Sequence, residues 1–149
     1  MRAVIQKSGK ASVEVNGKVI GQIQKGLVVL VGITNTDTEK DIDYIADKIS
    51  NLRLLDEGEK YFEKSIADTT KQILLISQFT LYAKCKKGRR PDFVNSAKAE
   101  VAEPIYNKLA DKLKNLGLDV QTGIFRAIMK VSLTNEGPVT IILDSNLTN

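Results

Sequence analysis

Alternating and continuous apolar stretches predict that β-strands fill much of the chain. β-branched residues alternate with polar ones from Arg2 onward, and Leu27 to Ile33 is a continuous apolar run. Alternation is typical of a strand with one buried face, and a short continuous run is typical of a strand buried on both faces. The predicted strands are residues 2–6, 11–15, 18–23, 27–33, 73–82, 124–133 and 139–143, with a strand end and polar loop at 54–64.

Two clusters of turn-forming residues separate predicted strands. Asn16-Gly17 predicts a two-residue hairpin turn, because both central positions of a type I′ turn need a positive φ. Asn135, Gly137 and Pro138 are also turn formers and predict a second hairpin turn before the last strand.

Two segments have the apolar spacing of helices. In the first, Thr38 is a candidate N-cap and Asp41 follows three residues later. The second is predicted over residues 96–116, with a start nearer Lys98, because Pro104 must lie in the first turn or kink a longer helix. The apolar stripes are Ile42, Ile45, Ile49 and Leu52 in the first helix, and Val101, Ile105, Leu109, Leu113 and Leu116 in the second.

The order of these elements is strands, helix, strand, helix, strands. It fits a mixed sheet with two helices packed on it. The length of 149 residues fits one domain of ordinary size. The apolar fraction of 42% and the charged fraction of 27% are those of a globular chain.

The chain contains no histidine. Histidine is the usual general base at neutral pH and the commonest metal ligand. Its absence excludes a Ser-His-Asp or Cys-His enzyme and a histidine-based zinc site. Catalysis must therefore use hydroxyls, carboxylates, lysines, backbone N–H groups or groups of the substrate. Acidic pairs such as Asp41 and Asp43 lack the partners of a metal cage, so we predict neither a metal nor a cofactor.

Cys85 is the only cysteine, so no disulfide can form within the chain. A reducing compartment is the simple interpretation. The chain runs from Met1 directly into a predicted strand, without the pattern of a signal peptide. The longest apolar run is far too short to cross a bilayer. We therefore expect a cytoplasmic protein without a membrane partner.

The positive charge of the chain is concentrated in one loop. The net charge is +4, and without five basic residues of this loop the chain has 22 − 5 = 17 basic and 18 acidic residues. A basic patch of this kind suits nucleic acid, but a solvated loop that only aids solubility has the same pattern. Both interpretations stay open. The five residues are Lys84, Lys86, Lys87, Arg89 and Arg90.

The polar end of one predicted strand is a candidate for chemistry. Ser77, Gln78 and Thr80 follow four apolar residues. If the strand continues to Thr80, Gln78 and Thr80 share one face, and Ser77 and Phe79 share the other. Such an end can present hydrogen-bond donors to a substrate. A buried strand with an ordinary polar exit has the same pattern.

The sequence resembles the D-aminoacyl-tRNA deacylase family, which includes the D-tyrosyl-tRNA(Tyr) deacylases, from end to end. Residues 77–81 match its SQxTL motif, and residues 135–140 match its NxGPxT motif. The opening residues 1–6, the Asn16-Gly17 hairpin and residues 87–91 are also similar to the family.

The resemblance implies a single domain over residues 1–149. Its fold would be α/β, with mixed, largely antiparallel β-sheets, a barrel-like core and two main helices packed on them. It also implies a homodimer in which each active site receives the Gly137–Pro138 segment of the other subunit, with the bond between them cis. The two carbonyls of that segment would reject the side chain of an L-aminoacyl group and admit a D-residue or glycine.

The chemistry implied by the resemblance is hydrolysis of the ester in D-aminoacyl-tRNA, and of glycine mischarged on tRNA(Ala). The 2′-hydroxyl of the terminal ribose would assist, and N–H groups near Phe79 and Thr80 would hold the oxyanion. A nucleophilic Thr80 is the weaker version, because no base exists to activate it.

The resemblance assigns the remaining roles more broadly. Ser77 and Gln78 would position the substrate. The supporting residues would be Lys7, Asn135 and Thr140. The groups that would bind adenosine or tRNA are Phe125, Met129, Lys86, Lys87, Arg89 and Arg90. A DNA partner is not expected.

Three positions depart from the family pattern. The family usually carries arginine where this chain has Lys7, and lysine lacks the planar fork that helps lock the Gly-Pro segment. The family commonly has glycine and aspartate where this chain has Arg126 and Ile128. These two changes could alter the rim of the adenosine site.

Two alternative functions remain at this point. One is a related editing enzyme that removes L-alanine from a non-cognate tRNA, but such relatives alter the start of the SQxTL motif and hold the Gly-Pro bond trans. The other is an RNA-binding module without catalysis, which the basic loop supports equally well.

Overall fold

Strand β1 (Arg2–Val15) pairs with other strands along both of its edges. The computed structural model describes residues 1–86 and 88–146. One edge of β1 pairs with β8 (Lys130–Asp144), and the other pairs with β3 (Gly26–Gly32) and then with β2 (Lys18–Ile23), all antiparallel. The Asn16-Gly17 turn between β1 and β2 is confirmed, with φ values of 50° and 77°.

Two parallel strands extend the sheet beyond β3. These are β6 (Gln72–Ser77) and β7 (Asp119–Thr122), and the full order is β2-β1-β3-β6-β7 with β8 beside β1. The two end strands, β2 and β7, contact each other, so the sheet curls into a nearly closed barrel. Strand β7 was not predicted from the sequence.

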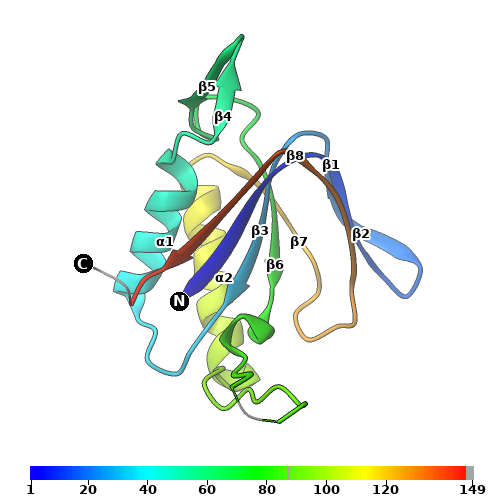
Figure 1. The fold of residues 1–149 in the computed structure, drawn as a ribbon, viewed down its shortest axis with the longest axis vertical. Coiled ribbons are helices and arrows are strands. Elements are labelled where there is room, and N and C mark those ends of the chain that lie inside the picture. Colours follow the sequence, from blue (N-terminus) through cyan, green and yellow to red (C-terminus); the bar gives the residue numbers. More distant parts are fainter. Residues whose placement is uncertain (87, 147–149) are drawn as a thin grey trace.

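Both helices cover one face of the sheet (Figure 1). Helix α1 (Glu39–Asn51) and helix α2 (Ala99–Asn115) contact each other. This arrangement confirms the predicted fold class, a mixed and largely antiparallel sheet with two main helices. No helix within the described residues is long and apolar enough to cross a membrane.

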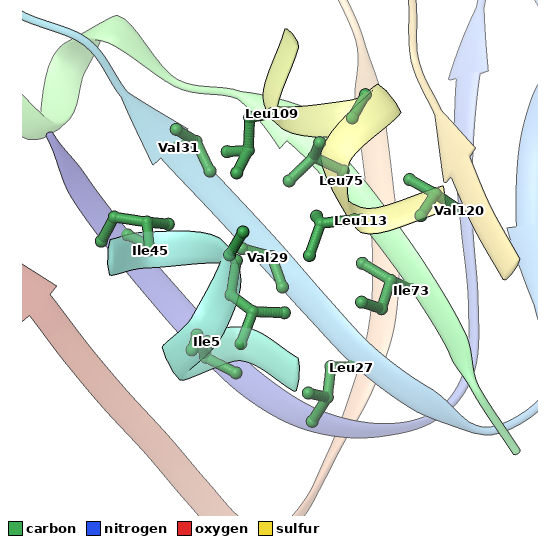
Figure 2. Packing of buried hydrophobic residues seen from close by; sticks show 14 of the residues in the cluster. Ile5, Leu27, Val29, Val31, Ile45, Ile73, Leu75, Leu109, Leu113 and Val120 are labelled. Atoms are coloured by element: carbon green, nitrogen blue, oxygen red, sulfur yellow. The ribbon is translucent and has the colours of Figure 1, made fainter. Parts of the chain in front are cut away.

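Two apolar clusters lie on opposite faces of the sheet. The larger one fills the space between sheet and helices, where Val29 and Leu75 meet Ile45 and Leu109 (Figure 2). The smaller one lies inside the curled sheet and includes Val28. Strand β3 therefore contributes to both clusters, as its continuous apolar run predicts.

Helix α1 begins as predicted. The Thr38 N–H donates to Asp41 Oδ2 at 2.7 Å, which satisfies one of the donors that a helix start leaves free. Ile42, Ile45 and Ile49 are buried. The predicted stripe of this helix is therefore confirmed at these three positions.

The buried face of helix α2 is rotated from the predicted one. The helix starts directly after Lys98, as expected, and Pro104 lies inside it. Val101 and Leu116, both assigned to the stripe, are 43% and 50% exposed. Tyr106 is buried instead, because its hydroxyl donates to the Leu75 carbonyl at 2.8 Å and so satisfies its polar atom. The buried residues of α2 are Ala102, Tyr106, Leu109, Ala110 and Leu113.

The segment predicted as a strand end and loop is a β-hairpin. It consists of β4 (Leu55–Glu57) and β5 (Lys60–Lys64) and projects from the body of the molecule (Figure 1). Both faces of β5 are almost entirely exposed, so its sequence lacks the alternation that identifies a half-buried strand.

The last two predicted strands are one strand, and the prediction of a hairpin turn between them is wrong. β8 begins at Lys130 rather than at Ile124 and continues to Asp144 along β1. Its register shifts between Gln6 and Ala11 of β1. The Gly-Pro segment is therefore an irregularity within a long strand pair, which is where proline is tolerated in sheets.

Candidate active site

The polar motif after β6 forms a turn rather than a strand end. β6 stops at Ser77, and Phe79–Tyr82 is a 3-10 helix, η1. The Gln78 N–H donates to the Val31 carbonyl at 2.7 Å, and the chain then turns away from the sheet. The prediction of a strand to Tyr82, with Gln78 and Thr80 on one face, is therefore wrong.

The start of η1 leaves backbone donors free. Among the described residues, none accepts a hydrogen bond from the N–H groups of Phe79 or Thr80. The first N–H groups of a helix have no partner within it. Two adjacent donors are thus available to an oxygen atom of a ligand.

A pocket of about 440 Å³ opens beside this turn. Ser77, Gln78 and Phe79 line it together with Phe125 and Met129. Five of the residues predicted for catalysis and adenosine binding therefore lie around one cavity. Part of the lining comes from residues that the sequence did not mark, among them Val31, Ile33, Ala97, Ala99 and Ala102.

Phe79 is held in place by two residues that sequence reasoning missed. Its ring contacts the Phe93 ring edge-on, with centroids 5.0 Å apart and planes at 67°. Its carbonyl accepts a hydrogen bond of 2.7 Å from Ser96 Oγ. Phe93 and Ser96 carry no motif of their own, and only their place just after the basic loop could have drawn attention to them.

Thr80 lies outside the pocket lining. It is exposed, and its Oγ1 accepts a hydrogen bond from Gln78 Nε2. This arrangement ties the Gln78 amide to the turn. It gives the Thr80 hydroxyl a structural partner but no base.

The basic loop begins at the end of η1. Backbone hydrogen bonds between Lys84 and Asp92, of 2.7 and 3.0 Å, close its base. Lys86, Arg89 and Arg90 are exposed. Lys87 lies outside the described residues, and Cys85 is an exposed free thiol. Because Phe93 follows this loop and touches Phe79, the loop stands next to the pocket.

The Gly137–Pro138 peptide bond is cis, as the resemblance implies. The segment is braced by Asn135, whose Oδ1 accepts the Val139 N–H at 3.1 Å and whose Nδ2 donates to Thr140 Oγ1 at 2.9 Å. Asn135 and Thr140 thus support the segment within one chain.

In one chain this segment lies away from the pocket. Gly137 and Pro138 are exposed, and neither is among the described residues that line the cavity. Figure 1 shows the middle of β8 near the β4–β5 hairpin, whereas β6 ends near the opposite end of the molecule. The two motifs are therefore not brought together within one subunit.

Lys7 lies opposite the Gly-Pro segment and pairs with the hairpin. It lies between two residues of β1 that pair with β8, Gln6 with Thr140 and Ser8 with Asn135. Its Nζ forms an ion pair with Asp56 Oδ2 on β4. The Lys7 hydrogen bond holds the pKa of Asp56 below its usual range.

The sheet face between the two motifs carries an apolar row that is buried at Ile76, half-buried at Leu30 and Val4, and exposed at Ile142. Ile142 pairs with Val4, Val4 with Leu30, and Leu30 with Ile76, which lines the pocket. Ile142 is 73% exposed. This face is the one opposite the helices, because the larger cluster buries Ala3, Ile5 and Val29 on the other side.

The two departures near the adenosine site differ in position. Arg126 is among the residues that line the pocket, is exposed and has a φ of 64°. Ile128 is 93% exposed and is absent from the described lining. Within the part of the chain that the structure describes, no group of three or more His, Cys, Asp or Glu residues could hold a metal ion.

Comparison with known proteins places this chain in a family. The model of the D-Tyr-tRNA(Tyr) deacylase family matches residues 4–144. The D-aminoacyl-tRNA deacylases of Brevibacillus brevis and Bacillus cereus are each 52% identical over 145 residues, which is 97% of this chain and at least 99% of theirs.

Solved structures share the fold. A chain titled "c-Myc DNA Unwinding Element Binding Protein" superposes with a TM-score of 0.89 at 42% identity, covering 97% of this chain and 99% of that one. A second, titled "Structural Analysis of a probable eukaryotic D-amino acid tRNA deacylase", has a TM-score of 0.84 at 16% identity, covering 95% and 97%. The latter shows the fold alone.

The chain therefore belongs to the D-Tyr-tRNA(Tyr) deacylase family. Membership carries D-aminoacyl-tRNA deacylase activity, which is hydrolysis of an ester bond.

Proposed function

We propose that this chain hydrolyses the ester between a D-amino acid and the 3′-terminal adenosine of tRNA, and releases free D-amino acid and tRNA. The pocket carries this proposal. Its walls combine apolar and aromatic side chains with a few polar groups, Ser77 and Gln78, beside the free N–H groups of η1. Sites for small organic groups have this composition.

The reaction needs little from protein side chains. Water attacks the ester carbonyl, and the N–H groups of Phe79 and Thr80 stabilise the oxyanion that forms. The ribose 3′-oxygen then leaves and takes up a proton, with the neighbouring 2′-hydroxyl of the substrate assisting. Two observations support this route, the free donors at the start of η1 and the absence of histidine from the chain. Ser77 and Gln78 position the substrate.

Chiral selection is proposed to come from a homodimer. The Gly137–Pro138 segment of one subunit enters the pocket of the other, and its carbonyls collide with the side chain of an L-aminoacyl group. The separation of this segment from the pocket within one chain supports the proposal. Each subunit thus carries the pocket at one end of the sheet face and the Gly-Pro segment at the other.

The apolar row from Ile142 to Ile76, which is exposed at Ile142 and half-buried at Val4, supports the same arrangement. In a two-fold dimer a patch packs against its own copy. If the axis lies across the middle of this face, the Gly-Pro end of one subunit meets the pocket end of the other. The contact would cover Ile142 and Val4, which a lone chain leaves partly or largely exposed.

Two further properties follow from this proposal. Glycine has no side chain to reject, so glycine mischarged on tRNA(Ala) would also be hydrolysed. Exposed Lys86, Arg89 and Arg90 beside the pocket would bind tRNA phosphates. A substrate of this kind would place the enzyme in the cytoplasm.

Turnover of matched esters tests the proposal. tRNA(Tyr) charged with D-tyrosine or with L-tyrosine is incubated with the protein, and release of each amino acid is measured against buffer. We expect rapid loss of the D-ester and buffer-like loss of the L-ester. If neither ester is lost faster than in buffer, the alternative of an RNA-binding module without catalysis is favoured. Preferential loss of L-alanine from a mischarged tRNA would instead identify the alternative editing activity.

A further inference from the structure

The rim of the pocket carries a single charged side chain. Of the described residues that line the cavity, Arg126 alone is charged, and the rest of the lining is apolar, hydroxyl or amide. Within residues 1–86 and 88–146, Arg126 forms no ion pair. A guanidinium without a carboxylate partner, at the mouth of a largely apolar cavity, is free to bind an anion that enters with the ligand.

The backbone at Arg126 is unusual for a large residue. Its φ of 64° lies in the left-handed region, which favours glycine. A side chain kept at such a position carries a conformational cost, and such costs gather at functional sites. The strain and the unpaired charge are two separate observations on the same residue.

We propose that Arg126 binds the phosphodiester on the 5′ side of the substrate's terminal nucleoside. This inference rests on the proposed function, and it adds the residue that recognises this group. The aminoacyl end of the substrate carries an ammonium, which the guanidinium would repel. The phosphodiester is the anionic group nearest the nucleoside, so the charge of Arg126 selects that end of the ligand.

The geometry of the pocket agrees with this orientation. Phe125 and Arg126 are neighbours in the chain, and both line the same cavity as Phe79. A base beside Phe125 would place its phosphate near the exposed Arg126. A guanidinium can donate two parallel N–H groups to one phosphate, which an ammonium cannot. The basic loop would then bind phosphates further along the tRNA.

Two substrates separate the phosphate contact from every other contact. One is D-tyrosyl-tRNA, and the other is adenosine esterified with D-tyrosine, which has no phosphate. The variants are Arg126→Gly, which also relieves the backbone, and Arg126→Lys, which keeps the charge. The control is Lys130→Gln, because Lys130 is an exposed cation four residues away that is absent from the described lining.

We expect Arg126→Gly to raise KM for D-tyrosyl-tRNA about tenfold with kcat nearly unchanged, the mark of weakened substrate binding. The log–log salt dependence of kcat/KM should flatten by about one phosphate contact. KM for D-tyrosyl-adenosine should not change. Arg126→Lys should recover part of the loss, and Lys130→Gln should match the wild type on both substrates.

Two outcomes would overturn the inference while leaving the proposed function intact. They are an unchanged KM for the tRNA substrate in Arg126→Gly, and an equal rise in KM for both substrates, which would make Arg126 merely structural. Failure of the wild type to hydrolyse either D-ester would instead refute the proposed function. Thermal denaturation of each variant verifies that it is folded.

Discussion

At the scale of single residues, Lys7 and Asp56 form the contact that ties the sheet to the hairpin. The side chain of Lys7 is only 10% exposed, so its ammonium depends on the carboxylate. Asp56 also accepts the Phe62 N–H at 3.3 Å. The pair thus fixes the β4–β5 hairpin at the point where β1 faces the Gly-Pro segment.

Replacing Asp56 with asparagine should lower the melting temperature at neutral pH, because the Lys7 ammonium loses its charged partner. The pKa of Asp56 is lowered in the folded protein, chiefly by the hydrogen bond from Lys7. Its contribution is therefore present above the unfolded aspartate value of about 3.9 and is lost as the pH falls through the folded value. Thermal denaturation at pH 7 and in acid measures this difference.

The control for this prediction is Glu59→Gln, an exposed acid in the same hairpin. It should melt like the wild type at both pH values. An Asp56→Asn variant that is equally destabilised in acid and at neutral pH would show that the ion pair is not the cause.

Thr80→Ala tests whether the threonine hydroxyl reacts. The hydroxyl is exposed and accepts a hydrogen bond from Gln78, and the proposed oxyanion donor is the backbone N–H, which alanine keeps. We expect kcat for D-tyrosyl-tRNA to stay within about tenfold, the effect of one modest hydrogen bond. A fall of roughly a thousandfold or more would instead indicate a nucleophile.

The residues of the site differ in how far sequence predicts them. Ser77 and Gln78 belong to a recognisable motif and do line the pocket. Phe93 and Ser96 hold Phe79, but their spacing matches no periodic pattern. Such partners come together only through the turn of η1, which the alternation of the preceding strand does not reveal.

At the scale of elements, β8 shows why local turn signals fail. Asn135, Gly137 and Pro138 each favour a turn. β1 nevertheless offers an edge along its whole length, and β8 stays paired to it on both sides of the segment. The strand pair absorbs the extra residues as an irregularity. Tertiary pairing therefore overrides the local preference, and sequence alone cannot weigh the two.

Helix α2 shows the same limit for packing. Its extent follows from periodicity, but the buried face includes Ala102 and Tyr106 in place of Val101 and Leu116. Small residues allow the helix to approach α1 and the sheet, and the Tyr106 hydroxyl finds the Leu75 carbonyl. Apolarity alone predicts neither choice.

The basic loop gives a prediction at this scale. If it binds tRNA phosphates, the double variant Lys86→Gln, Lys87→Gln should bind tRNA more weakly, and its salt slope should fall by about one for each phosphate that is no longer neutralised. The measurement is Kd for tRNA over a range of salt concentrations. A variant with Lys112→Gln and Lys114→Gln removes two charges from α2 and serves as the control. An unchanged salt slope would indicate that the loop aids solubility and does not bind tRNA.

At the scale of the whole molecule, the split between the two motifs is the dominant feature. The pocket and the Gly-Pro segment lie apart in each chain, on a face whose apolar row ends at the exposed Ile142. Gly137 has a φ of 115°, and a Cβ at this position would lie 2.7 Å from Val139 Cγ2. Gly137→Ala should therefore distort the segment while leaving the distant pocket unchanged.

Mixed dimers test whether the segment acts on the other subunit. Gln78→Ala removes the pocket amide, so its homodimer should be nearly inactive. The Gly137→Ala homodimer should hydrolyse esters with a lower ratio of D- to L-tyrosyl-tRNA turnover. A heterodimer of the two is isolated by tandem purification on two different tags, and its D/L ratio is measured.

In that heterodimer the active pocket belongs to the Gly137→Ala subunit. If the segment enters the opposite pocket, this pocket receives the intact segment of the Gln78→Ala subunit, and the wild-type D/L ratio returns. If the segment served its own subunit, the ratio would stay as low as in the Gly137→Ala homodimer. A tagged wild-type dimer purified in the same way gives the reference ratio. Because the Gln78→Ala pocket contributes almost no turnover of its own, a restored ratio indicates a site built by two chains.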